Sequence, residues 1–221
     1  MPNSFFAKVA LCLFALSLVP AQARSDFTSR DPSLKQPGHW EWTWDGDDGL
    51  GVSVAATVHY VPSGPARITV TGPDDLLERL RIGQGQIQWC EDCHVRSGRL
   101  DITVGGVPLR SVALHGGGDI QLGRLNQDRL NLAIAGTGEI SAGGRIDRLE
   151  LAISGSGNVR MGDAVVRRAD IAISGSGDAV VTPREEANVH VSGSGNIRMK
   201  AMPARLNQSV SGSGGVRIAD N

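Results

Sequence analysis

A Gly-x-Gly signature recurs six times in the second half of the chain, and this repeat constrains the fold more than any other feature of the sequence. Successive signatures are 20, 19, 20, 18 and 19 residues apart. Their first glycines are Gly116, Gly136, Gly155, Gly175, Gly193 and Gly212. A period of about 20 residues is typical of stacked repeat architectures, in which each unit buries its apolar face against its neighbours.

Apolar and polar residues alternate on both sides of each signature. Around the third signature, Leu151 and Ile153 precede the glycines, and Val159 and Met161 follow them. This period of two predicts two strands per unit, each with one buried face, and too few residues remain between strand pairs for a packed helix. We therefore predict an all-β fold in which residues 109–221 form a right-handed, single-stranded parallel β-helix, whose six coils span about 24 Å.

The glycines are predicted to form a corner in every coil, because glycine reaches positive φ at little steric cost and has no Cβ to collide with the corner above it. Serines flank these glycines at Ser154, Ser156, Ser174, Ser176, Ser192, Ser194, Ser211 and Ser213. We interpret the serines as structural, since no nucleophile elbow surrounds them.

The repeated units have the form Ile/Val-Ser-Gly-Ser-Gly-Asn/Asp-Val/Ile, and a segment Val-Thr-Gly-Pro-Asp-Asp-Leu-Leu begins at Val70. Together these motifs resemble the head GIN domain family, which is described as the head of auto-transporter adhesins. The resemblance covers Val52 to Ala219. It implies a secreted or periplasmic β-helical domain, and it gives neither a biochemical role nor a ligand.

The first 23 residues have the form of a cleavable signal peptide. Lys8 precedes an apolar run, and Ala21 and Ala23 give the small-x-small pattern that signal peptidase cuts. The run is too short to span a membrane. We therefore expect a protein without a membrane span in the periplasm, outside the cell or at its surface, with a flexible leader over residues 24–38.

Residues 39–108 are predicted to form an N-terminal β region that caps the coils and continues them within one domain. Trp40, Trp42 and Trp44 alternate, so a strand would place all three indoles on one face. Such a strand can cover the open end of the β-helix, or the indoles can form a platform for sugar rings. A short helix is predicted over residues 74–80.

Cys90 and Cys93 are the two cysteines that follow the signal peptide, and an oxidising compartment favours a disulfide between them. With His94 they also match the C-x-x-C-H spacing of c-type haem attachment. We favour the disulfide, because the motif lies between two predicted strands in a chain with only 4% aromatic residues. A zinc site lacks a fourth ligand, so neither a metal nor a cofactor is predicted.

A formal net charge of −1 gives no general attraction to nucleic acid, so a charged partner has to meet a local patch. One such patch is predicted on the outward position of the second strand of each coil. The stripe reads Gln121, Ser141, Arg160, Val180, Arg198 and Arg217. We interpret Arg160, Arg198 and Arg217 either as candidate ligands for an anionic glycan or phosphate-bearing polymer, or as a solvated face.

An acidic or amide residue follows the corner in five coils: Asp119, Glu139, Asn158, Asp178 and Asn196. The side chains of such residues commonly form hydrogen bonds with backbone groups in turns. These five post-corner residues include a single pair of carboxylates on neighbouring coils, Asp119 and Glu139, so no convergent catalytic set is evident.

The leading hypothesis is a noncatalytic, exported scaffold or adhesin-like module that binds an envelope glycan or a surface protein. The alternatives are a carbohydrate-active enzyme on the same scaffold and a periplasmic redox or haem protein. Because the last coil ends near Ile218 with little to cover it, end-to-end pairing of two copies is also predicted.

Overall fold

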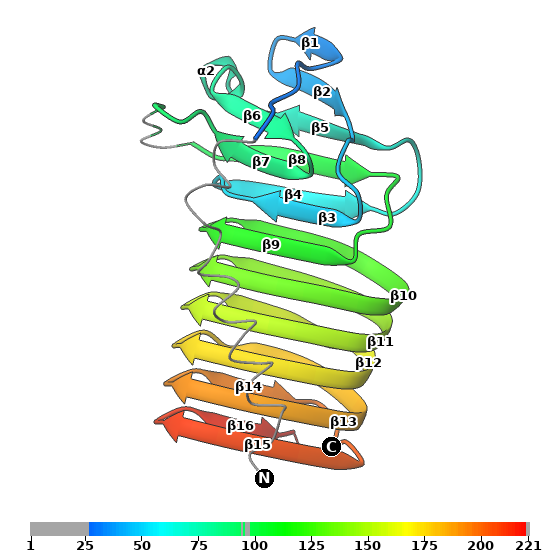
Figure 1. Ribbon diagram of the computed structural model, residues 1–221, viewed down its shortest axis with the longest axis vertical. Coiled ribbons are helices and arrows are strands. Elements are labelled where there is room, and N and C mark those ends of the chain that lie inside the picture. Colours follow the sequence, from blue (N-terminus) through cyan, green and yellow to red (C-terminus); the bar gives the residue numbers. More distant parts are fainter. Residues whose placement is uncertain (1–26, 94, 96–97, 220–221) are drawn as a thin grey trace.

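The computed structural model describes residues 27–93, 95 and 98–219, and these residues form a stack of β-coils around one elongated apolar core (Figure 1). The predicted signal peptide lies outside the described residues. No helix of the described residues is long and apolar enough to cross a membrane.

Parallel strands stack along the axis of the molecule and confirm the predicted β-helix. They are β9 (Ser111–Gly116), β10 (Asp119–Gly136), β11 (Glu139–Gly155), β12 (Asn158–Gly175), β13 (Ala179–Gly193), β14 (Asn196–Met199), β15 (Arg205–Gly212) and β16 (Gly215–Ile218). The coil is right-handed: in Figure 1 each front strand runs to the left, and the chain then returns behind it to the right at a lower level.

The register places like residues over like residues. Ile134, Ile153, Ile173 and Val191 are successive Cα partners, and each is fully buried. Because every inward column is filled by residues of similar shape, the coils pack through continuous apolar ladders.

Each central coil contains one long strand where the sequence predicted two short ones. β11, for example, runs without a break from Glu139 through the glycine-containing bend to Gly155. The register shifts at this bend, between Ser141 and Gly143, which marks a β-bulge or irregularity. A bulge bends a strand without ending its pairing, and this explains why hydrogen bonding continues around the third side of the coil.

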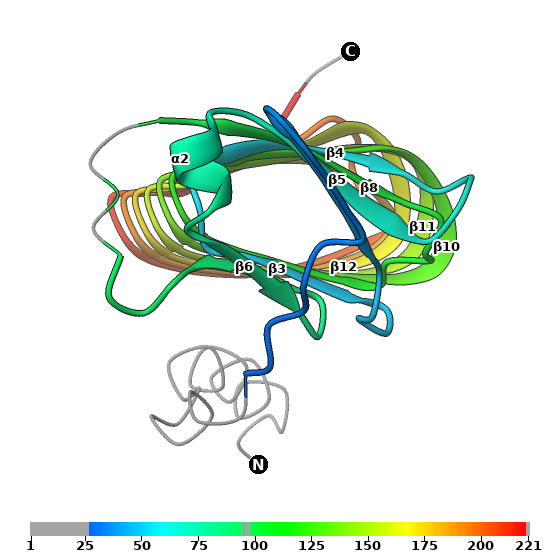
Figure 2. The ribbon, with the colours of Figure 1, turned by 90° about the horizontal axis from the view of Figure 1, so that it is seen from above.

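The N-terminal region continues the coils and then closes them. Its elements are β1 (Leu34–Gln36), β2 (His39–Thr43), β3 (Gly49–Val52), β4 (Ala56–Val61), β5 (Arg67–Thr71), α2 (Asp74–Leu77), β6 (Leu80–Gly83), β7 (Gln86–Trp89) and β8 (Leu100–Gly105). β3, β4, β7 and β8 extend the parallel ladders, whereas β2, β5 and β6 pair antiparallel at the margin. Seen from above, β2 and β5 cross the end of the coils, and α2 lies over another part of it (Figure 2).

The segment that the sequence assigned to a flexible leader packs against this cap over its described part. β1 pairs antiparallel with β2, and the backbone N–H of Arg30 donates to the carbonyl oxygen of Ile82 at 2.8 Å. The Arg30 guanidinium also forms an ion pair with Asp45 at 2.5 Å. Within the predicted leader, Arg30 and the residues of β1 therefore have hydrogen-bond partners that are distant in the sequence.

Candidate functional site

The six predicted corner glycines align in one seam along the solenoid. All six have positive φ, between 102° for Gly116 and 139° for Gly136. A Cβ added to Gly155 would lie 2.7 Å from the carbonyl oxygen of Gly136, so stacking excludes any side chain there. The flanking serines are exposed, and their hydroxyls form no hydrogen bond within the described residues.

The residues that follow the corner form a structural ladder. The side-chain oxygen of Asn158 accepts the backbone N–H of Asp178 at 3.1 Å, and Asp178 accepts the backbone N–H of Asn196 at 2.8 Å. These bonds link one coil to the next where the chain turns. The ladder's polar groups are thereby occupied in coil-to-coil contacts.

The two neighbouring carboxylates of that ladder each face an arginine. Asp119 forms an ion pair with Arg99, and Glu139 pairs with Arg160 at 3.1 Å. Within the described part of the chain, no group of three or more His, Cys, Asp or Glu residues is arranged to hold a metal ion.

The predicted arginine stripe exists as a register column. Gln121, Ser141, Arg160, Val180, Arg198 and Arg217 are successive Cα partners on β10 to β14 and β16. Each arginine of this column is exposed. The period of two was sufficient to place them on one face.

Two hollows lie along this column, and together we call them the basic trough. The larger, about 630 Å³, is lined among others by Arg124, Arg160 and Lys200. The smaller, about 280 Å³, is lined among others by Arg198 and Arg217. Val180 lines both, so the hollows follow one another along the solenoid.

The cations of the trough differ in how they are neutralised. Arg160 pairs with Glu139, and Lys200 pairs with Asp163 at 3.3 Å. Arg124, Arg198 and Arg217 have no ion pair or hydrogen bond among the described residues. The sequence pattern did not indicate Arg124 or Lys200, because both lie past the end of the alternating segment, at the bend that closes each coil.

The opposite face of the coils carries acidic and amide side chains that bond to one another. Asn188 donates to Asp170 at 2.8 Å, and Asn207 donates to Asn188 at 2.9 Å. Arg148 contacts Asp170 at 3.0 Å. Asp170, Asn188 and Asn207 on this face thus bond to one another, although the buried Oδ1 of Asn131 in the same register column has no hydrogen-bond partner among the described residues. The trough, by contrast, keeps unneutralised positive charge.

The three alternating tryptophans do not form an open platform. Trp42 and Trp44 are 2% and 8% exposed, and their indole N–H groups donate to the carbonyl oxygens of Arg30 and Asp47. Trp40 is half-buried, and the Lys35 ammonium lies 4.4 Å from its ring centroid. Burial therefore favours the cap interpretation over the sugar platform, because covered rings have no free face to stack on a sugar.

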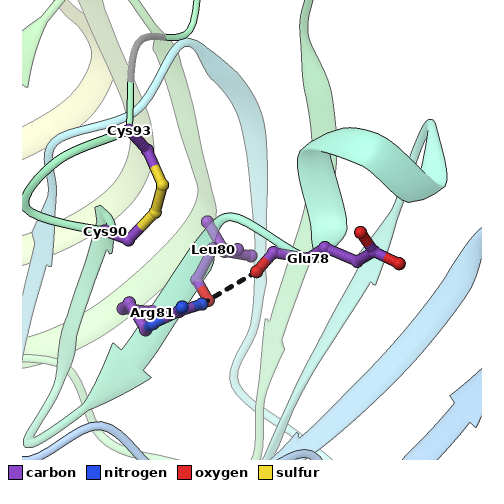
Figure 3. The surroundings of a disulfide bond; sticks show 5 residues. All are labelled: Glu78, Leu80, Arg81, Cys90 and Cys93. Carbon is purple, nitrogen blue, oxygen red and sulfur yellow. Dashed lines mark hydrogen bonds between the residues drawn. A yellow bond between two sulfur atoms is a disulfide. The ribbon is translucent and has the colours of Figure 1, made fainter.

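Cys90 and Cys93 form a disulfide, as predicted (Figure 3). Cys90 follows the end of β7, and its N–H donates to the carbonyl oxygen of Arg79 at 2.8 Å. Arg81, on the adjacent strand β6, donates to the carbonyl oxygens of Glu78 and Leu80. His94, the third residue of the haem-type motif, lies outside the described residues. The disulfide closes the turn that directly follows β7, in which the Cys93 N–H also donates to the carbonyl oxygen of Cys90 at 3.1 Å.

Comparison with known proteins identifies the family. The model of the family described as "Putative auto-transporter adhesin, head GIN domain" matches residues 47–203. The chain belongs to the head GIN domain family. This confirms the resemblance seen in the repeated glycine units, and the matched range includes the described coils as far as β14.

Solved structures share the fold at low sequence identity. A "putative adhesin" from Bacteroides fragilis is 18% identical, with a TM-score of 0.65 over 84% of this chain and 98% of that one. A "putative lipid binding protein" from Parabacteroides distasonis is also 18% identical, with a TM-score of 0.51 over 87% and 100% of the two chains. The search of curated proteins found no match.

Proposed function

We propose that the protein is an exported, noncatalytic, adhesin-like module of the cell envelope that binds its partner through a long side of the solenoid. Membership of the head GIN domain family is the observation that carries this proposal. The geometry is consistent with it, because the two neighbouring carboxylates are ion-paired at the corner seam. The proposed export depends on the signal peptide predicted at residues 1–23.

A retention experiment tests this function. The exported chain, purified and labelled, is mixed with isolated envelope fractions and sedimented. We expect saturable retention, with no shortening of envelope polysaccharide during incubation. Absence of retention would contradict the adhesin-like role, and release of sugar fragments that stops on Asp119→Asn or Glu139→Gln substitution would establish an enzyme instead.

N-terminal sequencing and mass measurement of the exported chain test the predicted cleavage site and the absence of an attached haem. Cleavage after Ala23 gives a chain that begins at Arg24, which N-terminal sequencing detects. Reduction should add two protons and reveal no attached haem, because the cysteines are bonded to each other. A Soret band or an added haem mass would favour the redox alternative.

We also propose that two copies pair through their C-terminal ends. Val210 in β15 is 40% exposed, and Leu206, Val216 and Ile218 beside it are half-buried. Among the described residues, β15 pairs only with β13 and β16 only with β14, and a strand edge of this kind can pair with another chain. Because the N-terminal end is covered by β2 and β5, a second copy is expected to meet the first end to end about a two-fold axis, with antiparallel strand pairing.

A further inference from the structure

Two arginines without ion pairs among the described residues lie on adjacent coils of the basic trough. Arg198 and Arg217 are Cα partners in β14 and β16, so their side chains leave the same face about 4.8 Å apart. Neither makes an ion pair or hydrogen bond with any described residue. Like charges on facing strand positions destabilise a sheet. An anion bound between the two guanidinium groups would relieve this repulsion.

Another arginine column shows that the repeat does not require such unpaired charge. Arg148, Arg168 and Arg205 lie in one register column on another side of the coils. Arg148 pairs with Glu150 at 3.2 Å, and Arg168 pairs with Glu185 at 3.5 Å. Arg205 lies 3.9 Å from Glu186. Three arginines of this column therefore have acidic partners, whereas Arg198 and Arg217 of the trough have none among the described residues; the exposed Arg129, at the start of the column, has no ion pair either.

The larger hollow adds cations whose present partners are easily exchanged. Arg160 and Glu139 have side chains 68% and 27% exposed, and Asp163, the partner of Lys200, is 90% exposed. Solvated pairs of this kind contribute little stability. An incoming anionic group can replace Glu139 or Asp163 as the partner of these cations at little cost.

Small and apolar residues line part of the trough. Val180 is half-buried between the two hollows, and Ala142, Gly143 and Gly162 line the larger one without bulky side chains. Such a lining accommodates the C–H faces of sugar rings, while arginine forks beside it match carboxylate or sulfate oxygens. The hollows succeed one another along the axis, which suits an extended polymer better than a compact ligand.

We propose that the basic trough binds a linear anionic polysaccharide, with acidic groups on Arg198 and Arg217 and the polymer running parallel to the solenoid axis. This inference rests on the proposed adhesin-like function and names its ligand class. The trough extends over six register positions, so affinity should rise with oligosaccharide length until the chain spans about 24 Å and then level off.

Titration with probes of matched backbone tests the ligand class. The full exported chain is titrated with dextran, dextran sulfate and alginate oligosaccharides of graded length, at low and high salt. We expect dextran sulfate and alginate to bind, with affinity that falls as salt rises, and neutral dextran not to bind. Equal binding of dextran would overturn the proposal, and so would binding of polyphosphate without binding of either acidic glycan.

Paired arginine variants test the location. Arg198→Gln combined with Arg217→Gln should weaken alginate binding at least about tenfold, because each removes a charge-assisted hydrogen-bond donor. The control, Arg148→Gln combined with Arg168→Gln, removes the same net charge from two ion-paired positions outside the trough and should change affinity less than about twofold. Equal losses in both variants would show that net charge alone attracts the polymer, which overturns the site.

The same variants separate this inference from the proposed function. If envelope fractions retain the Arg198→Gln, Arg217→Gln variant as well as the parent, the adhesin-like function stands and the trough is not its site. If the parent binds alginate but no envelope fraction retains it, the trough stands and the proposed function fails.

Discussion

The two ends of the solenoid are built differently. At the N-terminal end, β2 and β5 pair antiparallel across the coils and bury Trp42, whose indole N–H is satisfied by Arg30. At the C-terminal end, β15 and β16 repeat the coil before them, and the inward-facing side chains of this last coil are partly exposed. Val191 is fully buried, whereas its partner in the last coil, Val210, is 40% exposed.

This difference shows that a repeat cannot close itself. Each coil is covered by the next, so the final repeated coil always has one face without a neighbour. Closing an end takes a sequence that departs from the repeat, and in this chain the described residues before Gly105 supply it at one end. The predictions below test how much each end contributes.

The largest expected effect is at the capped end. Trp42→Ala removes a fully packed indole and should lower the free energy of unfolding by about 3–5 kcal/mol. The matched variant at the other end, Leu206→Ala, removes a half-exposed side chain and should cost less than about 1 kcal/mol. Urea denaturation of both variants measures the difference, and equal costs would mean that the cap is not the better packed end.

Alanine substitution should be less destabilising at the first glycine of the corner seam than at the later ones. An added Cβ at Gly116 meets nothing within 4 Å, while at Gly155 it meets the carbonyl oxygen of Gly136. Both glycines have positive φ, so both alanine variants carry backbone strain of about 1–3 kcal/mol. Gly155→Ala should cost about 1–3 kcal/mol more because of the collision. Thermal unfolding that ranked the two variants equally would contradict the steric account of the seam.

Substitutions at the C-terminal end of the solenoid should change self-association and have little effect on the free energy of unfolding. Leu206→Lys combined with Val210→Lys places charge on the proposed contact and should convert end-to-end pairs to single copies. Solution scattering measures the change in length. Val165→Lys is the control, because Val165 is 39% exposed on β12, away from the end. A parent chain that is a single copy at all concentrations would refute the pairing.

The smallest expected effect concerns the ion pair between Arg30, in the predicted leader, and Asp45. Burial tends to raise the pKa of Asp45, but hydrogen bonds from the Gln84 backbone and from Arg30 outweigh it and lower the pKa. A lowered folded pKa stabilises the protein above the unfolded value of about 3.9, and this stability is lost as pH falls through the folded pKa.

Asp45→Asn should therefore cost less than about 1 kcal/mol near neutral pH, since Arg30 is largely solvated. Melting curves of the variant and the parent should converge in acid. Asp128→Asn, at an exposed carboxylate without an ion pair among the described residues, should leave the curve unchanged at every pH. A gap between Asp45→Asn and the parent that widened on acidification would contradict the assigned sign.

The regular part of the fold could be read from local pattern. Alternation placed Ile134 and Ile153 inside, the spacing of glycines aligned Gly136 with Gly155, and the same register put Arg198 beside Arg217. These features depend on neighbouring residues and on a fixed coil length, both of which are visible in the chain. The predicted helix near residue 74 is also present, though shorter, at Asp74–Leu77.

The irregular features depended on partners that no local pattern identifies. The pairing of β1 with β2 and the hydrogen bond from Trp42 to Arg30 join segments that the repeat does not relate. That Arg124 and Lys200 line the same hollow also follows only from the way in which their coils stack.

The sequence by itself determined the coil, its corners and the column of arginines, because steric rules and period-two alternation act over a few residues and repeat unchanged. The tertiary structure alone decided which arginines are neutralised and which end is covered. Both outcomes depend on side chains from distant segments meeting in space, and the free energy of those contacts exists only once the coils have stacked.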